Sequence, residues 1–136
     1  MKKYMNLSIV YAIIAMVFGV FYREFTKFSG FSGRTTLSFI HGHYLVLGMG
    51  FFLMLVLVEK LFGISQSKNF GKTILFYQIG LNISVAAFLT RGIIQVKNLL
   101  ISNAFDAALS GVAGIGHILL GISLLIALFT IKKKVV

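Results

Sequence analysis

Residues 109–131 read LSGVAGIGHILLGISLLIALFTI, an apolar run that contains no charged side chain. A helix needs about 20 such residues to cross the hydrocarbon core of a bilayer. Three runs of similar character precede this one, at residues 4–22, 37–58 and 73–90. The sequence therefore predicts four membrane-spanning helices.

The composition of the whole chain also indicates lipid as its main solvent. Of the 136 residues, 58% are hydrophobic, more than a soluble domain of this length could bury. Backbone polar groups have no water to bind inside a bilayer, so helices are favoured over a barrel of many short strands. Because most connections are short, we expect neighbouring helices to be antiparallel. The predicted fold is an all-α integral membrane four-helix bundle, with residues 1–136 as one domain.

Several classes of function are excluded at this point. The chain has no cysteine, which excludes disulfides, thiolate metal sites and redox chemistry that passes electrons between thiols. Its net charge is +10, but the charges flank the apolar runs and do not form one basic face. We therefore expect no binding to nucleic acid.

The distribution of positive charge predicts the orientation. Eight lysines lie before the first run, between the second and third runs, and after the fourth, namely Lys2, Lys3, Lys60, Lys68, Lys72, Lys132, Lys133 and Lys134. The other two connections carry five positive charges, partly offset by Glu24 and Asp106. The positive-inside rule then predicts that the N- and C-termini are cytoplasmic. We expect a multi-pass protein of the cell membrane, and specifically of a bacterial cytoplasmic membrane.

All three histidines of the chain lie inside the predicted helices. His41 and His43 are near the start of the second run, and His117 is near the start of the fourth. Polar side chains are costly in lipid, so each is a candidate functional residue. The alternative is that each histidine only forms a hydrogen bond between helices.

The depths of the histidines favour a shared site. The second and fourth helices run in the same direction, and their histidines lie at similar depths, at ~1.5 Å of rise per residue. Two such imidazoles can bind one iron from opposite sides, as axial ligands of haem b. We predict His43 and His117 as these ligands, with His41 as the alternative to His43. His41 and His43 are about 200° apart around the helix, so only one can face His117.

The histidine left over has several possible partners: a haem propionate, a backbone carbonyl or a neighbouring subunit. A copper or zinc ion held by all three histidines is a further alternative. Such a site would require the helix to distort between residues 41 and 43.

Glycines near the histidines would leave room for a planar macrocycle. Gly114 and Gly121 lie at i−3 and i+4 from His117, on the same helical face, and Gly50 lies two turns beyond His43. We interpret these three glycines as cofactor-binding positions. Close packing of membrane helices is the alternative explanation.

Arg91 is the predicted partner of a haem propionate, because it follows a polar stripe on the third helix. Contact with lipid headgroups is the alternative. The stripe includes Gln78 and Asn82, amides that most often bond to neighbouring helices but could contact a haem edge or a quinone. Two connections, Arg23–Thr36 and Gln95–Ala108, are about fifteen residues long. In the second of these, Val96–Ile101 is expected to form a short interfacial element.

The stretch Phe39–Gly48, FIHGHYLVLG, resembles the H-x-H-x4-G helix of small proteins similar to haem–copper oxidase subunit I. The resemblance covers one helix. It implies a b-type haem held in a helix bundle by His43 or His41 together with His117. The chain has far fewer helices and histidines than that subunit, so no oxygen-reducing centre is implied.

These observations predict a membrane haem b protein, resembling a cytochrome, for electron transfer or for sensing or handling haem or a diatomic gas. It is expected to be a redox or binding protein more than a substrate-converting enzyme. The expected partners are the bilayer, a second copy in a homodimer, and a redox partner or quinone. A small oligomeric transporter and a non-catalytic accessory subunit are the alternatives.

Overall fold

The computed structural model describes residues 1–135, and within them the chain is all-helical. It has four long helices, here called spanning helices after the role predicted for them, and the first is α1 (Lys2–Phe28). The second is continuous and consists of α2 (Leu37–His43), the π-helical segment η1 (Tyr44–Gly50) and α3 (Phe51–Phe62). A short 3₁₀ turn, η2 (Ile64–Gln66), leads to α4 (Phe70–Lys97), and α5 (Asn103–Val135) follows. All four spanning helices are long and apolar enough to cross a membrane, which confirms that part of the prediction.

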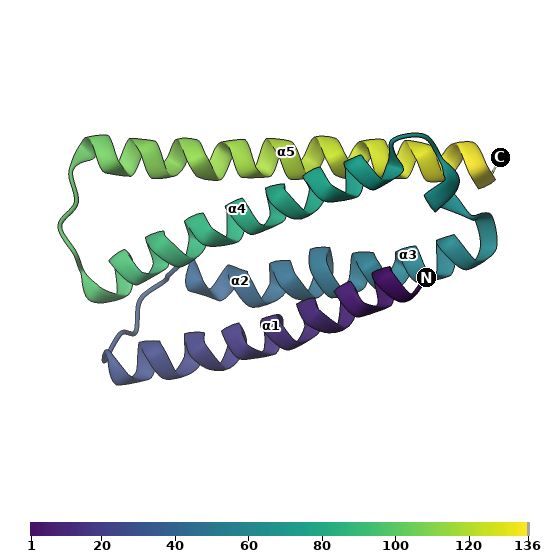
Figure 1. Ribbon diagram of the computed structural model, residues 1–136. Helices are drawn as coiled ribbons and strands as arrows, with labels where there is room; N and C mark the ends of the chain where they lie inside the picture. The colour runs from purple at the N-terminus through teal and green to yellow at the C-terminus, as the bar shows by residue number, and fades with distance from the viewer. Residues whose placement is uncertain (136) are drawn as a thin grey trace.

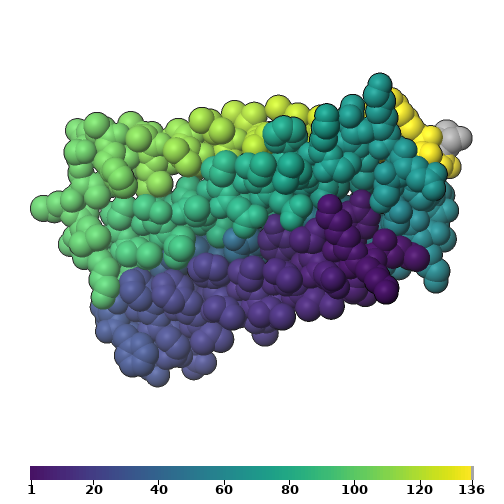
Figure 2. Space-filling model, viewed as in Figure 1, coloured from purple at the N-terminus to yellow at the C-terminus, as the bar shows by residue number. Residues whose placement is uncertain are grey.

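The helices form an elongated bundle in which successive spanning helices run in opposite directions (Figure 1). The N-terminus, the C-terminal end of α5 and the α3–α4 connection lie at one end, here called the terminal end. The α1–α2 and α4–α5 connections lie at the other, the two-loop end. In the space-filling view, α4 lies between α5 and α1 on the visible face (Figure 2).

The helices extend beyond the apolar runs. Hydropathy detects the part of a helix that matches the hydrocarbon core, whereas polar turns can continue the same helix into the headgroup region. α4 ends at Lys97, where Asn98 adopts a left-handed conformation (φ 50°) and terminates the helix. The expected long connection Gln95–Ala108 is therefore only residues 98–102. The prediction of a separate element at Val96–Ile101 is wrong, because Val96 is a buried residue of α4.

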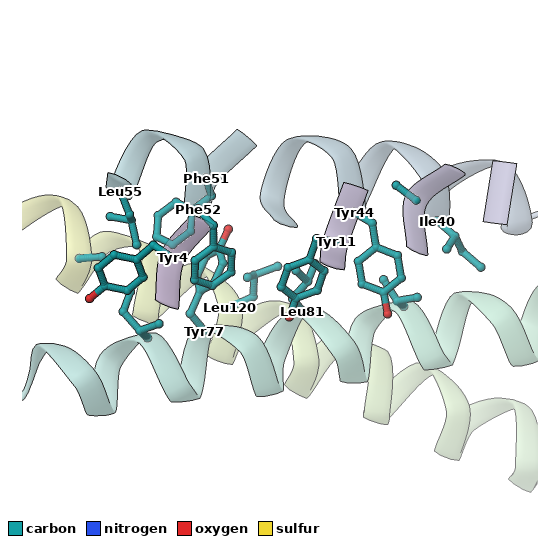
Figure 3. Packing of buried hydrophobic residues seen from close by; sticks show 14 of the residues in the cluster. Tyr4, Tyr11, Ile40, Tyr44, Phe51, Phe52, Leu55, Tyr77, Leu81 and Leu120 are labelled. Carbon is teal, nitrogen blue, oxygen red and sulfur yellow. The ribbon is translucent and has the colours of Figure 1, made fainter. Parts of the chain in front are cut away.

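Aromatic side chains form much of the core toward the terminal end. Figure 3 shows their rings in a row between the second spanning helix and α4. The rings of Phe51 and Tyr77 stack with centroids 4.1 Å apart, and those of Tyr11 and Phe52 with centroids 5.5 Å apart. Gly48 makes this packing possible, since a Cβ there would lie 2.7 Å from Cγ of Tyr11.

The π-helical segment η1 follows His43 directly and is bonded to both neighbouring helices. A π-helix widens the backbone and departs from the regular i→i−4 ladder of hydrogen bonds. The Tyr77 hydroxyl of α4 donates to the Leu47 carbonyl (2.7 Å), and the Ser8 hydroxyl of α1 donates to the Met49 carbonyl (3.0 Å). These two bonds hold the segment that connects His43 to the aromatic core.

α5 packs mainly on α4, through a narrow stripe of mostly small residues. A Cβ on Gly80 would lie 2.5 Å from the backbone nitrogen of Leu120, so the two backbones come into direct contact. The buried residues of α5 are only Gly116, Leu120, Ser123 and Ala127. The remaining faces of α5 are largely exposed, and a groove separates α5 from the second spanning helix.

Candidate histidine site

His43 of α2 and His117 of α5 lie close together beside this groove, with their ring planes nearly perpendicular. Their ring centroids are 6.1 Å apart and their planes make an angle of 83°. Phe88 of α4 contacts both rings, at centroid distances of 4.9 Å to His43 and 5.4 Å to His117. Three helices thus contribute one ring each, and α4 forms the floor of the site.

Each of these imidazoles is oriented by its own helix. Nδ1 of His43 is 2.9 Å from the Phe39 carbonyl oxygen, and Nδ1 of His117 is 2.7 Å from the Ala113 carbonyl oxygen. A carbonyl oxygen can only accept a hydrogen bond, so Nδ1 donates in both rings. This leaves Nε2 of each ring available as a ligand. Histidines that bind metals are commonly held by such a bond from their second nitrogen.

His41 faces a different helix. Its Nδ1 lies 2.8 Å from the Ala15 carbonyl oxygen of α1, and its ring packs over Gly19, where a Cβ would lie 3.0 Å from Nδ1. His41 therefore joins α1 to α2, as expected for a residue about 200° from His43 around the helix. The remaining histidine was expected to bond to a haem propionate, a backbone carbonyl or a neighbouring subunit. The structure shows the backbone carbonyl as the partner of His41.

This arrangement overturns the alternative of a copper or zinc ion held by all three histidines. His41 points to α1, whereas His43 and His117 meet beside α5. Within residues 1–135, no group of three or more histidine, cysteine, aspartate or glutamate side chains could hold a metal ion. The site offers two imidazole ligands.

The three predicted cofactor glycines differ in their surroundings. A Cβ on Gly114 or Gly121 would meet no atom within 4 Å, so the face of α5 on both sides of His117 is open. A Cβ on Gly50 would lie 3.3 Å from the Leu45 carbonyl oxygen. Gly50 lines the apolar groove, which has a volume of about 520 Å³. The other lining residues are Leu45, Val46, Leu47, Met49, Phe51, Met54, Leu124 and Leu128.

The groove adjoins the histidine pair along both helices. Val46 lies three residues beyond His43, and Leu124 lies two turns beyond His117 on the same face of α5. Its volume is in the range of ordinary cofactor and ligand pockets, which extends from roughly 300 to 1,000 Å³. His117 itself is exposed, so the site opens to the surface of the bundle.

Arg91 lies at the two-loop end and bonds to the start of α5. Its Nη1 is 2.9 Å from Oδ1 of Asp106, and its Nη2 donates to Oγ of Ser110 at 2.8 Å. Ser110 is two turns before His117. These bonds clamp α4 to α5 above the histidine pair, and the predicted contact with a propionate stays a prediction.

Sequence reasoning missed two parts of the site. Phe88 is one of fourteen phenylalanines, and nothing in its sequence context distinguishes it from the rest. The pairing of Arg91 with Asp106 had a detectable signal, since two opposite charges flank one connection. Asn82 bonds to neighbouring helices, as its polar stripe suggested. Its Oδ1 accepts from the Tyr44 hydroxyl (2.9 Å), and its Nδ2 donates to the Tyr11 hydroxyl (3.1 Å).

Comparison with known proteins identifies a family whose description gives no function. The family model described as "Protein of unknown function (DUF2871)" matches residues 1–134. No curated protein and no solved structure matches the chain. These comparisons provide no link to haem–copper oxidase subunit I.

Proposed function

We propose that this chain, which belongs to the DUF2871 family, is a membrane protein that binds one haem b through His43 and His117. The family description assigns no activity, so the proposal is based on the geometry of the histidine pair. The observation that carries the proposal is the 6.1 Å separation of the two rings. Two imidazoles that bind one iron from opposite sides, with Fe–N bonds of about 2 Å, have ring centroids about 6 Å apart.

The number of ligands favours haem over a bare metal ion. Structural zinc sites usually have four protein ligands, and catalytic ones three. The histidine pair supplies two, which suits a cofactor that brings four nitrogen ligands of its own and needs only axial ones. The angle of 83° is compatible with this arrangement, since the planes of two axial imidazoles can make any angle with each other about the axis through the iron.

The surroundings of the pair also fit a macrocycle. Gly114 and Gly121 leave the face of α5 open beside His117, and the apolar groove with Gly50 continues from the pair toward the terminal end. The Phe88 ring contacts both imidazoles, so it would have to turn away from the pair to admit the macrocycle. We propose that Arg91, at the two-loop end, compensates a propionate while it remains bonded to Asp106.

With two histidine ligands, the bound haem would supply one-electron redox chemistry. The residues of the chain would then orient and tune it. The Phe39 and Ala113 carbonyls hold the imidazoles through Nδ1, which raises the basicity of the ligating nitrogens. Because both axial positions are occupied by protein, electron transfer to a redox partner or a quinone is the role that fits best. Gas sensing would require one ligand to exchange.

We propose that the protein lies in the cytoplasmic membrane of a bacterium, with its terminal end facing the cytoplasm. Eight lysines lie at this end, and the two-loop end carries fewer positive charges. In this orientation the histidine pair would lie toward the outer half of the bilayer. Labelling of single cysteines introduced at Ser67 and Ser102 tests the assignment, since only the second should react with an impermeant reagent in intact cells.

We propose further that two copies form a homodimer. Most of α5 is exposed, so the faces of α5 away from His117 are available to a helix of a second copy. Crosslinking in native membranes should yield a dimer band, and recovery of monomer alone would contradict the proposal.

Haem titration of the purified protein tests the proposed function. The wild-type chain should bind one haem, and His43→Ala and His117→Ala should each lose tight binding. His41→Ala is the matched control, because it removes a membrane histidine that faces α1. A wild-type protein that stays folded and binds no haem would instead favour a non-catalytic accessory subunit.

A further inference from the structure

We propose that a second groove, between α4 and α5 at the terminal end, binds an anionic phospholipid. This groove is separate from the histidine site and has a volume of about 370 Å³. Its wall is apolar, formed by Phe76, Leu119, Ile122 and Ile126. Its polar lining consists of Asn69, Lys72, Thr73 and Ser123. Such a division suits a molecule with a charged head and an apolar chain.

The polar rim has the chemistry of a phosphate site. Asn69 precedes α4, and its side chain does not cap the helix. Backbone N–H groups in the first turn of a helix have no partners within the helix, and the helix dipole favours an anion there. Lys72 lies in this same first turn of α4 and lines the groove. A phosphodiester at the rim would therefore meet both the helix N-terminus and an ammonium group.

Ser123 provides independent support from within the groove. Its side chain is only 3% exposed and lines the groove, yet no side-chain hydrogen bond joins it to another of residues 1–135. Several other hydroxyls in these helices bond back to their own helix. Ser84 donates to the Gly80 carbonyl at 2.9 Å, and Thr130 donates to the Ile126 carbonyl at 2.8 Å. Within the described residues every fully buried side-chain polar atom has a partner, so the unpartnered Ser123 hydroxyl opens onto the groove. It is free to donate a hydrogen bond to a ligand there.

Phospholipid ester groups match this hydroxyl. In a phospholipid, ester carbonyls lie between the phosphate and the acyl chains and can only accept hydrogen bonds. Ser123 would donate to an ester carbonyl, with the phosphate at Lys72 and an acyl chain along Ile122 and Leu119. The groove thus offers a partner for each part of one lipid molecule.

The charge of this end selects an anionic headgroup. The lysines here include Lys132, Lys133 and Lys134 at the end of α5, and Glu59 is the only acidic residue at this end of residues 1–135. The Glu59 carboxylate already accepts a hydrogen bond from the Ser65 backbone at 2.8 Å. A headgroup with an uncompensated phosphate is therefore favoured over a zwitterionic one.

Native mass spectrometry of the full-length protein in detergent tests the proposal. The probes are phosphatidylglycerol and phosphatidylcholine with identical acyl chains, and inorganic phosphate as a competitor. The wild-type protein should prefer phosphatidylglycerol by about fivefold, and Lys72→Gln should remove most of this preference, because Lys72 is the lysine that lines the groove. Ser123→Ala should weaken binding of both lipids without changing their ratio, because both carry the same esters. Inorganic phosphate should compete poorly.

A matched control removes a lysine from the same end but outside the groove. Lys60 lies on α3 and does not line the groove, so Lys60→Gln should retain the preference. The proposal is overturned if Lys60→Gln reduces the preference as much as Lys72→Gln, because the effect would then be general charge. It is also overturned if Ser123→Ala binds both lipids like the wild type, or if inorganic phosphate displaces the lipid.

Discussion

The rings of His43 and His117 lie 6.1 Å apart, although α2 and α5 are held together chiefly through α4. Phe88 of α4 contacts both rings and fixes the floor of the site. The positions of the two histidines therefore depend on separate contacts. The position of His43 depends on the packing of α2 against α1 and α4, and that of His117 on the packing of α5 against α4. Substitutions at these contacts should change stability, whereas substitutions at the open faces of the site should change haem binding.

Gly121→Leu should block haem binding while the protein stays folded. A Cβ at Gly121 meets nothing within 4 Å, so a larger side chain would extend into the open space beside His117. Haem content per chain, measured after purification, should fall several-fold. Gly111→Leu is the control, because Gly111 is equally open but lies almost two turns before His117. Equal haem content in both variants would contradict the placement of the macrocycle beside Gly121.

His41→Ala should lower stability without affecting the haem. The substitution removes the hydrogen bond to the Ala15 carbonyl, and interhelical bonds of this kind contribute roughly 1 kcal/mol. Unfolding by denaturing detergent should shift by about that amount, while the absorption spectrum should be unchanged. A change of axial ligation in this variant would show that His41 and not His43 binds the iron.

Gly80→Ala should destabilise the contact between α4 and α5. The added methyl would lie 2.5 Å from the Leu120 backbone nitrogen, so one helix must move, and overpacking of this kind costs about 1–3 kcal/mol. Gly111→Ala adds the same methyl group where there is open space and should be neutral or slightly stabilising. Thermal unfolding of the two variants in the same detergent measures the difference. Equal stability would mean that the close backbone contact is absent.

Tyr77→Phe should loosen the π-helical segment that follows His43. The variant keeps the ring stacked on Phe51 but removes the donor to the Leu47 carbonyl. Loss of this bond should cost ~1 kcal/mol and increase amide hydrogen exchange in residues 44–50. Tyr22→Phe, at the other end of the bundle, is the control. Unchanged exchange in Tyr77→Phe would show that η1 is stable without this bond.

The sequence predicted the four long apolar helices well, because a helix is the only practical structure for such runs in lipid. Their ends were less predictable, since polar residues such as Arg91 and Lys97 continue α4 past its apolar run. Helix termination depended on local backbone conformation at Asn98, which has no hydropathy signal.

The histidine site was partly predictable for a geometric reason. Equal depth along helices of the same direction brought His43 and His117 together as candidates, and the angle between His41 and His43 required them to face different helices. The roles of the glycines were not predictable in this way. Gly48 and Gly116 make close packing contacts, whereas Gly114 and Gly121 stay open, and only the helix arrangement distinguishes them.

The absorption spectrum of the purified protein, oxidised and dithionite-reduced, shows directly whether His43 and His117 hold a haem. The wild-type protein and His41→Ala should have a sharp Soret band, with split α and β bands on reduction. His43→Ala and His117→Ala should each lose this spectrum. A wild-type protein without a Soret band after expression with added haem, or an unaltered spectrum in either of these two variants, would contradict a haem held by His43 and His117.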